Sequence, residues 1–282
     1  MRKKREKTAY LFLLPSLLGT TIFVFLPFLD VIRRSFFQAV GGVFVGLENY
    51  QEVLKNAAFQ QALSNTGRFL IVCIPLLLCS SFGMALWIYH LPVGKQLMES
   101  VCLLPMAIPV ASIVVFWKLL FHENGVLTQM AEWFGYTGKD WINTDAAFWI
   151  LIFTYLWKNL GYDVVLWIAG LASIPTEHYE AARVDGAGAC QSFWNITLPQ
   201  MTGSFWMIGI LSFINAFRVF REAYLIAGDY PHESIYMLQH LFNNWFVKLD
   251  IQKMSAAAVM AAAVIGGIFV ILQWRMEKEK RL

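Results

Sequence analysis

The sequence predicts an all-α integral membrane protein with six transmembrane helices. Hydrophobic residues make up 58% of the chain and charged residues only 15%, whereas a soluble domain carries about 25% charged residues. The apolar residues are gathered into runs of roughly 20 residues, which is the length that crosses a bilayer. Short polar segments separate these runs.

A basic segment and the first apolar run open the chain. Residues 1–8 form a lysine- and arginine-rich tail, and residues 9–30 follow as the first predicted transmembrane helix. A signal peptide has a similar basic start, but its apolar core spans about 7–15 residues and ends at a small-residue cleavage site. The run is longer than that and shows no clear cleavage site. We therefore expect a retained helix, with kinks or ends at Pro15 and Pro27.

Five more apolar runs follow at intervals along the chain. Their predicted transmembrane helices cover residues 64–90, 98–121, 146–172, 201–223 and 254–274. The polar segments between the runs cover residues 31–63, 91–97, 122–145, 173–200 and 224–253, and residues 275–282 form a second charged tail.

The positions of lysine and arginine predict the orientation in the membrane. These residues concentrate in both tails, in the 91–97 turn and in the 173–200 segment. By the positive-inside rule, such segments face the cytoplasm. Arg33 and Arg34 lie just outside the first helix against this trend, but the tails outweigh them. We therefore expect cytoplasmic termini, and external segments at residues 31–63, 122–145 and 224–253.

The 173–200 segment is a polar, small-residue island with a specific spacing. Its residues favour a short helix, for which we expect Thr176 to be the N-cap, and Pro199 suits the first turn of the next membrane helix. The spacing is Glu-Ala-Ala, three residues, Gly, nine residues, Ile, one residue and Leu-Pro, at Glu180, Ala181, Ala182, Gly186, Ile196, Leu198 and Pro199.

This spacing resembles the EAA loop of the permease subunits of ABC importers. Asp185 and Ala187 extend the match to the Asp-Gly-Ala form that is usual in the sugar-transporting branch. Residues 46–50 (Gly-Leu-Glu-Asn-Tyr) and 156–161 (Leu-Trp-Lys-Asn-Leu-Gly) also resemble the carbohydrate permeases of the lactose, glycerol-3-phosphate and maltose F-type class.

The resemblance implies a type I ABC importer permease (MetI-like) fold and a coupling role for the loop. In that family the loop forms a cytoplasmic coupling helix, seated in a cleft of an ATP-binding subunit. The residues that would couple this chain to the ATPase are Glu180, Ala181, Ala182, Asp185, Gly186, Ala187, Ile196, Leu198 and Pro199. The implied partners are a second, different permease subunit, a cytoplasmic ABC ATPase dimer and an extracellular solute-binding protein, in a bacterial-type cell membrane.

No ATP site or other cofactor site is expected in the chain itself, so we do not expect an enzyme. The chain lacks a GxxxxGK[S/T] phosphate loop, and Gly135-Tyr-Thr-Gly-Lys139 has the wrong glycine spacing. ATP is therefore expected to bind a partner subunit. The four cysteines have no metal-type spacing, and no basic patch interleaved with aromatic residues suggests nucleic acid.

Charged and polar residues inside two of the runs are candidates for the substrate path. Charged side chains within spans are costly and usually face a bundle interior or an aqueous cavity. Amide and aromatic groups also suit the edges and faces of sugars. The candidates are Trp157, Lys158, Asn159, Tyr162, Asp163, Asn215 and Arg218. The alternative is structural: Lys158 and Asp163 could each pair with another helix, and Trp157 could be a lipid-facing or packing residue. Asp163 is also a departure from the sugar-transporting branch, which often has Asn there, and this bears on the substrate class.

Two other function classes are disfavoured by the sequence. An ion-driven secondary transporter often carries paired repeats with broken helices, and we find no such repeat. An intramembrane enzyme would need a nucleophile–base or metal constellation within the spans, and none with recognisable spacing is present. We therefore expect a permease subunit that forms half of the translocation path for a sugar or oligosaccharide.

Overall fold

The structure is a computed structural model that describes residues 12–133, 135, 141–217 and 219–279. The predicted basic tail at residues 1–8 and the candidate residue Arg218 lie outside the described residues. In the described part, regular structure is helical apart from one isolated antiparallel bridge between Phe37 and Phe44. The chain divides into two compact units, Met1–Gln60 with Leu241–Val270 and Gln61–His240 with Ile271–Leu282.

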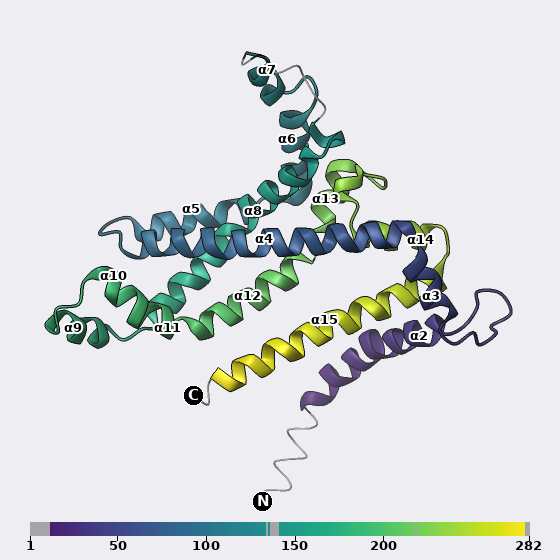
Figure 1. Cartoon of the computed structure of the whole chain (residues 1–282), viewed down its shortest axis with the longest axis horizontal. Helices are drawn as coiled ribbons and strands as arrows, with labels where there is room; N and C mark the ends of the chain where they lie inside the picture. The colour runs from purple at the N-terminus through teal and green to yellow at the C-terminus, as the bar shows by residue number, and fades with distance from the viewer. Residues whose placement is uncertain (1–11, 134, 136–140, 218, 280–282) are drawn as a thin grey trace, which may run out of the picture. The chain divides into compact units, whose positions relative to one another are not determined.

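The first unit contains the predicted first span and most of the last helix. The chain is helical from Phe12 to Ser35, with a π-helical turn η1 at Thr21–Phe25 that continues into α2 at Leu26–Ser35. Next comes the short helix α3 (Glu48–Lys55). Helices α14 (Leu238–Val247) and α15 (Ile251–Glu279) also lie largely in this unit (Figure 1). Lys253 of α15 forms an ion pair with Glu52 of α3 at 2.7 Å.

The Gly-Leu-Glu-Asn-Tyr sequence at 46–50 closes the C-terminal end of α2. The Asn49 side-chain amide donates to the carbonyl oxygens of Ser35 (2.9 Å) and Phe37 (3.1 Å). The Tyr50 hydroxyl lies 2.7 Å from the Ser35 hydroxyl. The last carbonyls of a helix have no intrahelical partner, so Asn49 satisfies one of them. Gly46 has φ +57°, which suits a glycine.

The second unit contains the remaining helices. In chain order they are α4 (Ala57–Tyr89), α5 (Lys95–Ala107), α6 (Val110–Phe121), α7 (Val126–Trp133), η2 (Trp141–Asn143), α8 (Ala146–Ala172), α9 (Thr176–Val184), α10 (Ala189–Ser192), η3 (Phe193–Thr197), α11 (Leu198–Gln200), α12 (Thr202–Ala216), α13 (Phe220–Ala227) and η4 (Glu233–Ile235). Two clusters of buried apolar residues join α4, α8 and α12, one centred on Phe69 and Phe148 and the other on Trp167 and Met201.

Glycines allow α8 to approach its neighbours closely. A Cβ atom at Gly161 would fall on the backbone carbonyl of Cys102 in α5. A Cβ at Gly170 would lie 2.7 Å from the Ser204 hydroxyl of α12. A larger residue at Gly161 would force α8 and α5 apart, because the obstacle is backbone, whereas at Gly170 the Ser204 and Met201 side chains would have to move.

Both π-helical turns stand directly before a Leu-Pro pair. After η1, the Leu26 amide donates to the Thr21 carbonyl, five residues back. After η3, the Leu198 amide donates to the Phe193 carbonyl in the same way. Proline has no N–H to continue the i→i−4 pattern, and the turn before each pair is widened. The Leu198-Pro199 part of the predicted motif therefore accompanies a local change in the backbone, the π-helical turn η3.

The predicted third span is not one continuous helix. We expected a helix over residues 98–121, but α5 ends at Ala107 and α6 begins at Val110. Ile108 is extended, with φ −77° and ψ 131°. Proline disfavours the helical conformation in the residue before it, so Pro109 accounts for the break. The predicted fifth run likewise divides into α12 and α13.

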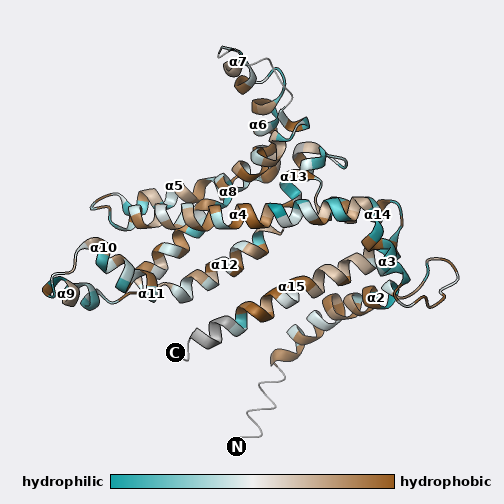
Figure 2. Ribbon diagram, in the orientation of Figure 1, coloured by the Kyte–Doolittle hydropathy of each residue, from teal (hydrophilic) through white to brown (hydrophobic). Residues whose placement is uncertain are grey.

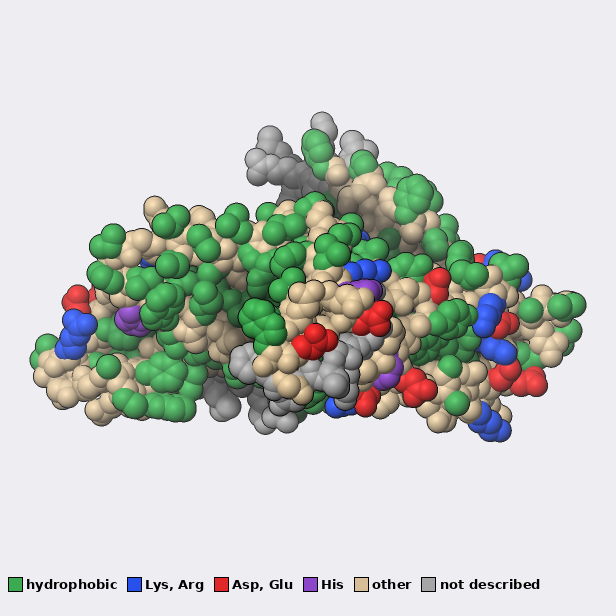
Figure 3. Space-filling model, turned by 90° about the horizontal axis from the view of Figure 1, so that it is seen from above, with side chains coloured by type: hydrophobic (Ala, Val, Ile, Leu, Met, Phe, Trp, Pro, Cys, Tyr) green, Lys and Arg blue, Asp and Glu red, His purple; other side chains and the backbone are tan. Residues whose placement is uncertain are grey.

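Much of the apolar surface is exposed. Among the described residues, five helical stretches are long and apolar enough to cross a membrane: Phe12–Ser35, Ala57–Tyr89, Val110–Trp133, Thr202–Leu225 and Ile251–Trp274. Figure 2 shows these long helices as mainly hydrophobic, with α3 and α9 more hydrophilic. Hydrophobic side chains are also far more widespread than charged ones on the face seen in Figure 3. A chain with such a surface belongs in a lipid bilayer.

Helix α8 is not among these five stretches, although it has 27 residues. It carries Lys158, Asn159 and Asp163, which lower its hydropathy. A helix of that length extends roughly 40 Å, enough to cross a bilayer. The count of six transmembrane helices therefore depends on α8.

Candidate functional site

A polar cavity lies within the second unit, next to the middle of α8. Its volume is about 460 Å³. The residues that line it come from α5, α8, α12, α13 and α14, and they are Met106, Tyr155, Lys158, Asn159, Asn215, Arg221, Glu222 and Gln239. Three of the predicted substrate-path residues, Lys158, Asn159 and Asn215, are among them.

An ion pair between α8 and α13 forms part of the cavity wall. The Lys158 ammonium lies 2.6 Å from the Glu222 carboxylate, and the two side chains are only 14% and 9% exposed. Separating either charge from its partner would leave it poorly solvated, which is strongly unfavourable. The pair therefore fixes α13 to α8 and leaves little net charge in this part of the wall.

The other polar groups of the cavity are amides, a phenol and the Arg221 guanidinium. Asn159 donates to the Tyr155 carbonyl at 2.9 Å, and Gln239 donates to the Phe217 carbonyl at 2.6 Å. A side-chain amide has two donor hydrogens and an acceptor oxygen, so these contacts use only part of the capacity of each group. The cavity thus presents several neutral hydrogen-bonding groups.

Tyr155 is the most informative of the lining residues. It is 2% exposed, and its ring packs edge-on against Phe69. Its hydroxyl oxygen is buried and has no hydrogen-bond partner among the described residues. Buried polar groups are almost always hydrogen-bonded. A partner supplied by the contents of the cavity would satisfy this one.

Other predicted candidates do not line the cavity. Asp163 is 1% exposed and accepts a 2.7 Å hydrogen bond from Ser212 of α12. Trp157 packs edge-on against Trp117 of α6, with ring centroids 5.6 Å apart. Tyr162 is partly buried and is absent from the described lining. For Asp163 and Trp157 the geometry favours the structural alternative raised by the sequence.

The predicted candidates omit five of the eight residues that line the cavity: Met106, Tyr155, Arg221, Glu222 and Gln239. Glu222 lies within the predicted run 201–223. It is a charged residue in a span, so the criterion that selected Lys158 should have selected it too. Arg221 is its neighbour. Gln239 and Met106 carried no comparable signal, because only the folded chain brings them beside α8.

The motif segment 173–200 is a chain of short helices at one end of the second unit. In Figure 1, α9 to α11 lie at the same end as the turn between α4 and α5. Leu91 of that turn packs on the same apolar cluster as Tyr179 and Ile196 of the segment. No residue of α9 is buried, and Val184 at its end is 88% exposed. The segment therefore presents a largely free surface.

Gly186 has a backbone role in this segment. Its φ is +80°. The Ala187 amide donates to the Ala182 carbonyl at 2.8 Å, and the Gly186 amide donates to the Arg183 carbonyl at 3.0 Å. These two bonds are a Schellman motif, which ends a helix with glycine in the left-handed region. The number of residues between Glu-Ala-Ala and Gly therefore fixes the position at which α9 ends.

The start of α9 differs from the prediction. Thr176 is the first helical residue and Pro175 holds the N-cap position, without a side-chain cap hydrogen bond. Pro175 is extended, with ψ 131°, so the helix begins one residue earlier than expected. Pro199 was predicted in the first turn of the next membrane helix, but it lies in the short α11, just before α12 begins at Thr202.

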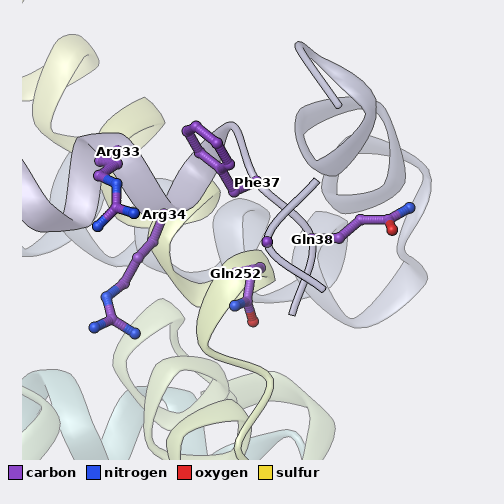
Figure 4. A pocket seen from close by; sticks show the side chains of 6 residues that line it. Arg33, Arg34, Phe37, Gln38 and Gln252 are labelled. Carbon is purple, nitrogen blue, oxygen red and sulfur yellow. The ribbon is translucent and has the colours of Figure 1, made fainter. Parts of the chain in front are cut away.

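A second polar hollow lies in the first unit, beside Arg33, Arg34 and Gln252, with a volume of about 210 Å³. Figure 4 shows both guanidinium groups extending to one side of it and the Gln38 amide pointing away. Arg34 is already paired with Asp30 at 2.6 Å. These side chains do not converge on a common point, so we do not assign a ligand site to this hollow.

The fold and these features define a helical membrane protein with a polar cavity beside α8. Residues 76–278 match the family described as "Binding-protein-dependent transport system inner membrane component". The match covers well over half of the chain, and the chain belongs to this family.

Individual relatives agree with this assignment. The chain is 30% identical to "Probable ABC transporter permease protein YurN" of Bacillus subtilis (strain 168), over 95% of each chain. It is 26% identical to "Probable starch degradation products transport system permease protein AmyD" of Thermoanaerobacterium thermosulfurigenes, over 96% of this chain and 94% of the relative.

A solved structure shows the same fold. A chain from the crystal structure of a bacterial ABC transporter involved in the import of the acidic polysaccharide alginate superposes with a TM-score of 0.83 at 20% identity. The match covers 99% of this chain and 97% of that one. The predicted all-α permease fold is therefore confirmed.

Proposed function

We propose that this chain is a permease subunit of an ATP-driven importer and forms half of the translocation path for a sugar or oligosaccharide. Relatives whose names refer to starch degradation products and to trehalose and maltose support the carbohydrate class. The family supports transport that depends on a binding protein. No feature of the structure favours an ion-driven transporter.

The proposed topology has six spans. Helix α8 is the span that the apolar criterion omits, because its polar residues face the cavity and the α12 interface. Helices α5 and α6 together form one broken span in place of the Val110–Trp133 stretch, in which α6 ends at Phe121 and α7 begins at Val126. Helix α5 has 13 residues and α6 has 12, so either alone would extend only about 20 Å. The basic tails place both termini in the cytoplasm of a bacterial-type cell.

The proposed partners divide the work of transport. A second, homologous permease completes the path, and an extracellular binding protein delivers the solute. A cytoplasmic ABC ATPase dimer binds and hydrolyses ATP, and it docks on α9 and the adjoining motif residues. This chain then needs no cofactor of its own.

The observation that carries the solute path is Tyr155, a residue of the cavity wall whose buried hydroxyl has no hydrogen-bond partner among the described residues. A solute hydroxyl group can donate to it or accept from it, and the neighbouring amides offer further hydrogen bonds. The amides, the Tyr155 phenol and the Arg221 guanidinium suit a polyhydroxylated solute, and Arg221 would also suit a solute that carries a negative charge. A pocket built from such groups discriminates against solutes that leave them unpaired.

Uptake by the reconstituted importer tests this proposal. The complete complex is placed in proteoliposomes containing ATP and offered a panel of radiolabelled mono- and oligosaccharides with the binding protein. We expect ATP-dependent uptake of at least one saccharide, and an increase in its half-saturating concentration of about tenfold in Tyr155→Phe, from the lost hydrogen bond.

Tyr162→Phe is the matched control, since it removes the same atom from a tyrosine of α8 that does not line the cavity. Uptake that persists without the ATPase would contradict the proposal, as would equal kinetics for Tyr155→Phe and the wild type.

A further inference from the structure

One hydrogen bond connects the exposed helix α9 to the base of the transmembrane helices. The Tyr179 hydroxyl lies 2.9 Å from the Thr197 hydroxyl. Tyr179 immediately precedes the Glu-Ala-Ala sequence, and Thr197 is the variable position between Ile196 and Leu198. Neither residue belongs to the motif spacing, yet the bond joins its two halves.

The two ends of this bond lie in different environments. Thr197 is 6% exposed and is the last residue of the π-helical turn η3. Tyr179 is partly buried, and its ring packs on the cluster that contains Trp167 and Met201. Among the described residues, no other side chain of α9 makes a hydrogen bond or an ion pair. Tyr179 is thus the main side-chain attachment of α9 to the membrane helices.

The attachment leads toward the polar cavity. The cluster beneath Tyr179 contains Ile168 of α8 and Ile208 of α12. The same two helices carry Lys158 and Asn215 into the cavity wall. A displacement of α9 that is transmitted through Tyr179 therefore acts on helices that shape the cavity.

We propose that the Tyr179–Thr197 hydrogen bond is a positioning contact that transmits movement of α9 to α8 and α12. Without it, the exposed helix can shift under the ATPase while the membrane helices stay in place. This inference rests on the proposed function, because it assumes that an ATPase docks on α9. It adds two residues that the motif does not include.

The contact can be broken without disturbing the surface that the ATPase would meet. Tyr179→Phe and Thr197→Val each remove one hydroxyl group and keep nearly the same volume. Thr197→Ser keeps the hydroxyl and should behave as the wild type. Ser173→Ala is a matched control, since it removes a hydroxyl from the same segment whose hydrogen bond, to the Gly170 carbonyl at 2.7 Å, is local.

The experiment follows the cavity directly. In the complete importer, with native cysteines replaced, Met106→Cys places a thiol in the cavity wall, and its rate of maleimide labelling is measured with and without ATP. We first require that ATP change this rate when Tyr179 and Thr197 are intact; failure at this step would count against the proposed function itself.

We expect the ATP-dependent change to fall about fivefold in Tyr179→Phe and in Thr197→Val, the effect of one typical net hydrogen bond. The double variant should be no worse than either single variant, because the two residues share one interaction. The amount of co-purified ATPase and its hydrolysis rate should stay within about twofold of the wild type.

Three results would overturn the inference while leaving the proposed function intact. The variants could respond to ATP as the wild type does, or their effects could add in the double variant. Loss of the co-purified ATPase would assign Tyr179 to docking or folding instead of to transmission.

Discussion

The polar cavity and the 173–200 segment use polar residues in opposite ways. In the cavity, Lys158 and Glu222 are 64 residues apart, nearly buried, and paired at 2.6 Å. In the segment, Glu180 and Arg183 are accessible, and the shape depends on backbone contacts around Gly186. The cavity is defined by contacts between helices that are far apart in the sequence, whereas the segment is defined by contacts between residues a few positions apart.

This difference explains why a sequence motif marks one region and not the other. A helix stop needs glycine at a fixed distance, so the segment keeps a spacing that can be recognised along the chain. A cavity wall needs side chains that meet in space, and many sequence positions can supply them. Substitutions in the two regions should therefore differ in the size and in the kind of their effect.

The largest effect is expected at the buried ion pair. Glu222→Ala leaves the Lys158 ammonium buried without its partner, which costs about 3–5 kcal/mol. Thermal unfolding of the detergent-purified complex would measure this loss. Replacing both residues, as in Lys158→Met with Glu222→Leu, should recover most of the stability. Equal stability of Glu222→Ala and the wild type would show that the pair is not buried as described.

Acid should destabilise the second unit through His240. This residue is fully buried in α14 and accepts a hydrogen bond from the Met237 amide through Nδ1 at 3.1 Å. Burial lowers the pKa of His240 from 6.5 to about 4, although Asp229 acts in the opposite direction. Below pH 6.5 the unfolded chain binds a proton that the folded chain does not, so stability is complete above that pH.

As the pH falls from 6.5 toward 4, this contribution should decrease by up to about 1.4 kcal/mol per pH unit. Thermal unfolding at pH 7.5 and pH 5 would measure it. His240→Asn cannot titrate in this range and should show a flatter pH dependence. The same slope in both proteins would exclude His240 as the cause.

An effect of about 1–3 kcal/mol, from overpacking, is expected where α8 contacts α5. Gly161→Ala places a Cβ on the Cys102 carbonyl, and the two helices must separate. Gly203→Ala is the matched control, since a Cβ there has no neighbour within 4 Å, and it should be neutral or slightly stabilising. Similar unfolding temperatures for the two variants would contradict this packing.

In the segment, Gly186→Val should impair coupling more than folding. A β-branched residue at φ +80° costs about 1–2 kcal/mol locally, which unwinds the end of α9 without touching the core. We expect normal membrane insertion but less co-purified ATPase. Gly186→Asn, which tolerates this φ better, should retain more of it. If Gly186→Val were lost from the membrane altogether, Gly186 would be needed for folding, and the two regions would not differ in the kind of effect that substitutions have.

The smallest effect is expected at Asp163. An asparagine can still accept the Ser212 hydrogen bond, so Asp163→Asn should change stability by less than about 1 kcal/mol. Because Asp163 does not line the cavity, the half-saturating solute concentration in the uptake assay should stay the same. A large change in that concentration would return Asp163 to the substrate path.

The sequence was sufficient for features that depend on local composition. The long apolar runs correspond to long helices in the structure, and the 173–200 spacing identified the family. Local rules placed Pro199 close to the start of α12, but missed that α11 precedes this helix. The prediction of one continuous helix over residues 98–121 was wrong. It relied on the apolar composition of this run and gave too little weight to the effect of Pro109 on the backbone of Ile108.

Contacts between distant residues could not be predicted. Nothing in the spacing of Lys158 indicates Glu222 as its partner, and Gln239 approaches the cavity only after several helices have packed. Asp163 and Lys158 are both charged residues of α8, yet Asp163 faces Ser212 and Lys158 faces the cavity. That distinction depends on the rotation of α8 in the bundle.

Site-directed photocrosslinking from Val184 tests the central claim most directly. Val184 is 88% exposed at the end of α9, so a benzophenone side chain placed there should not disturb the fold. In intact cells we predict one major crosslinked product, with the cytoplasmic ATPase subunit. The same side chain at Val40, which is 85% exposed in the predicted external segment, should give no ATPase product. Crosslinking of the ATPase from Val40, or its absence from Val184, would contradict the account.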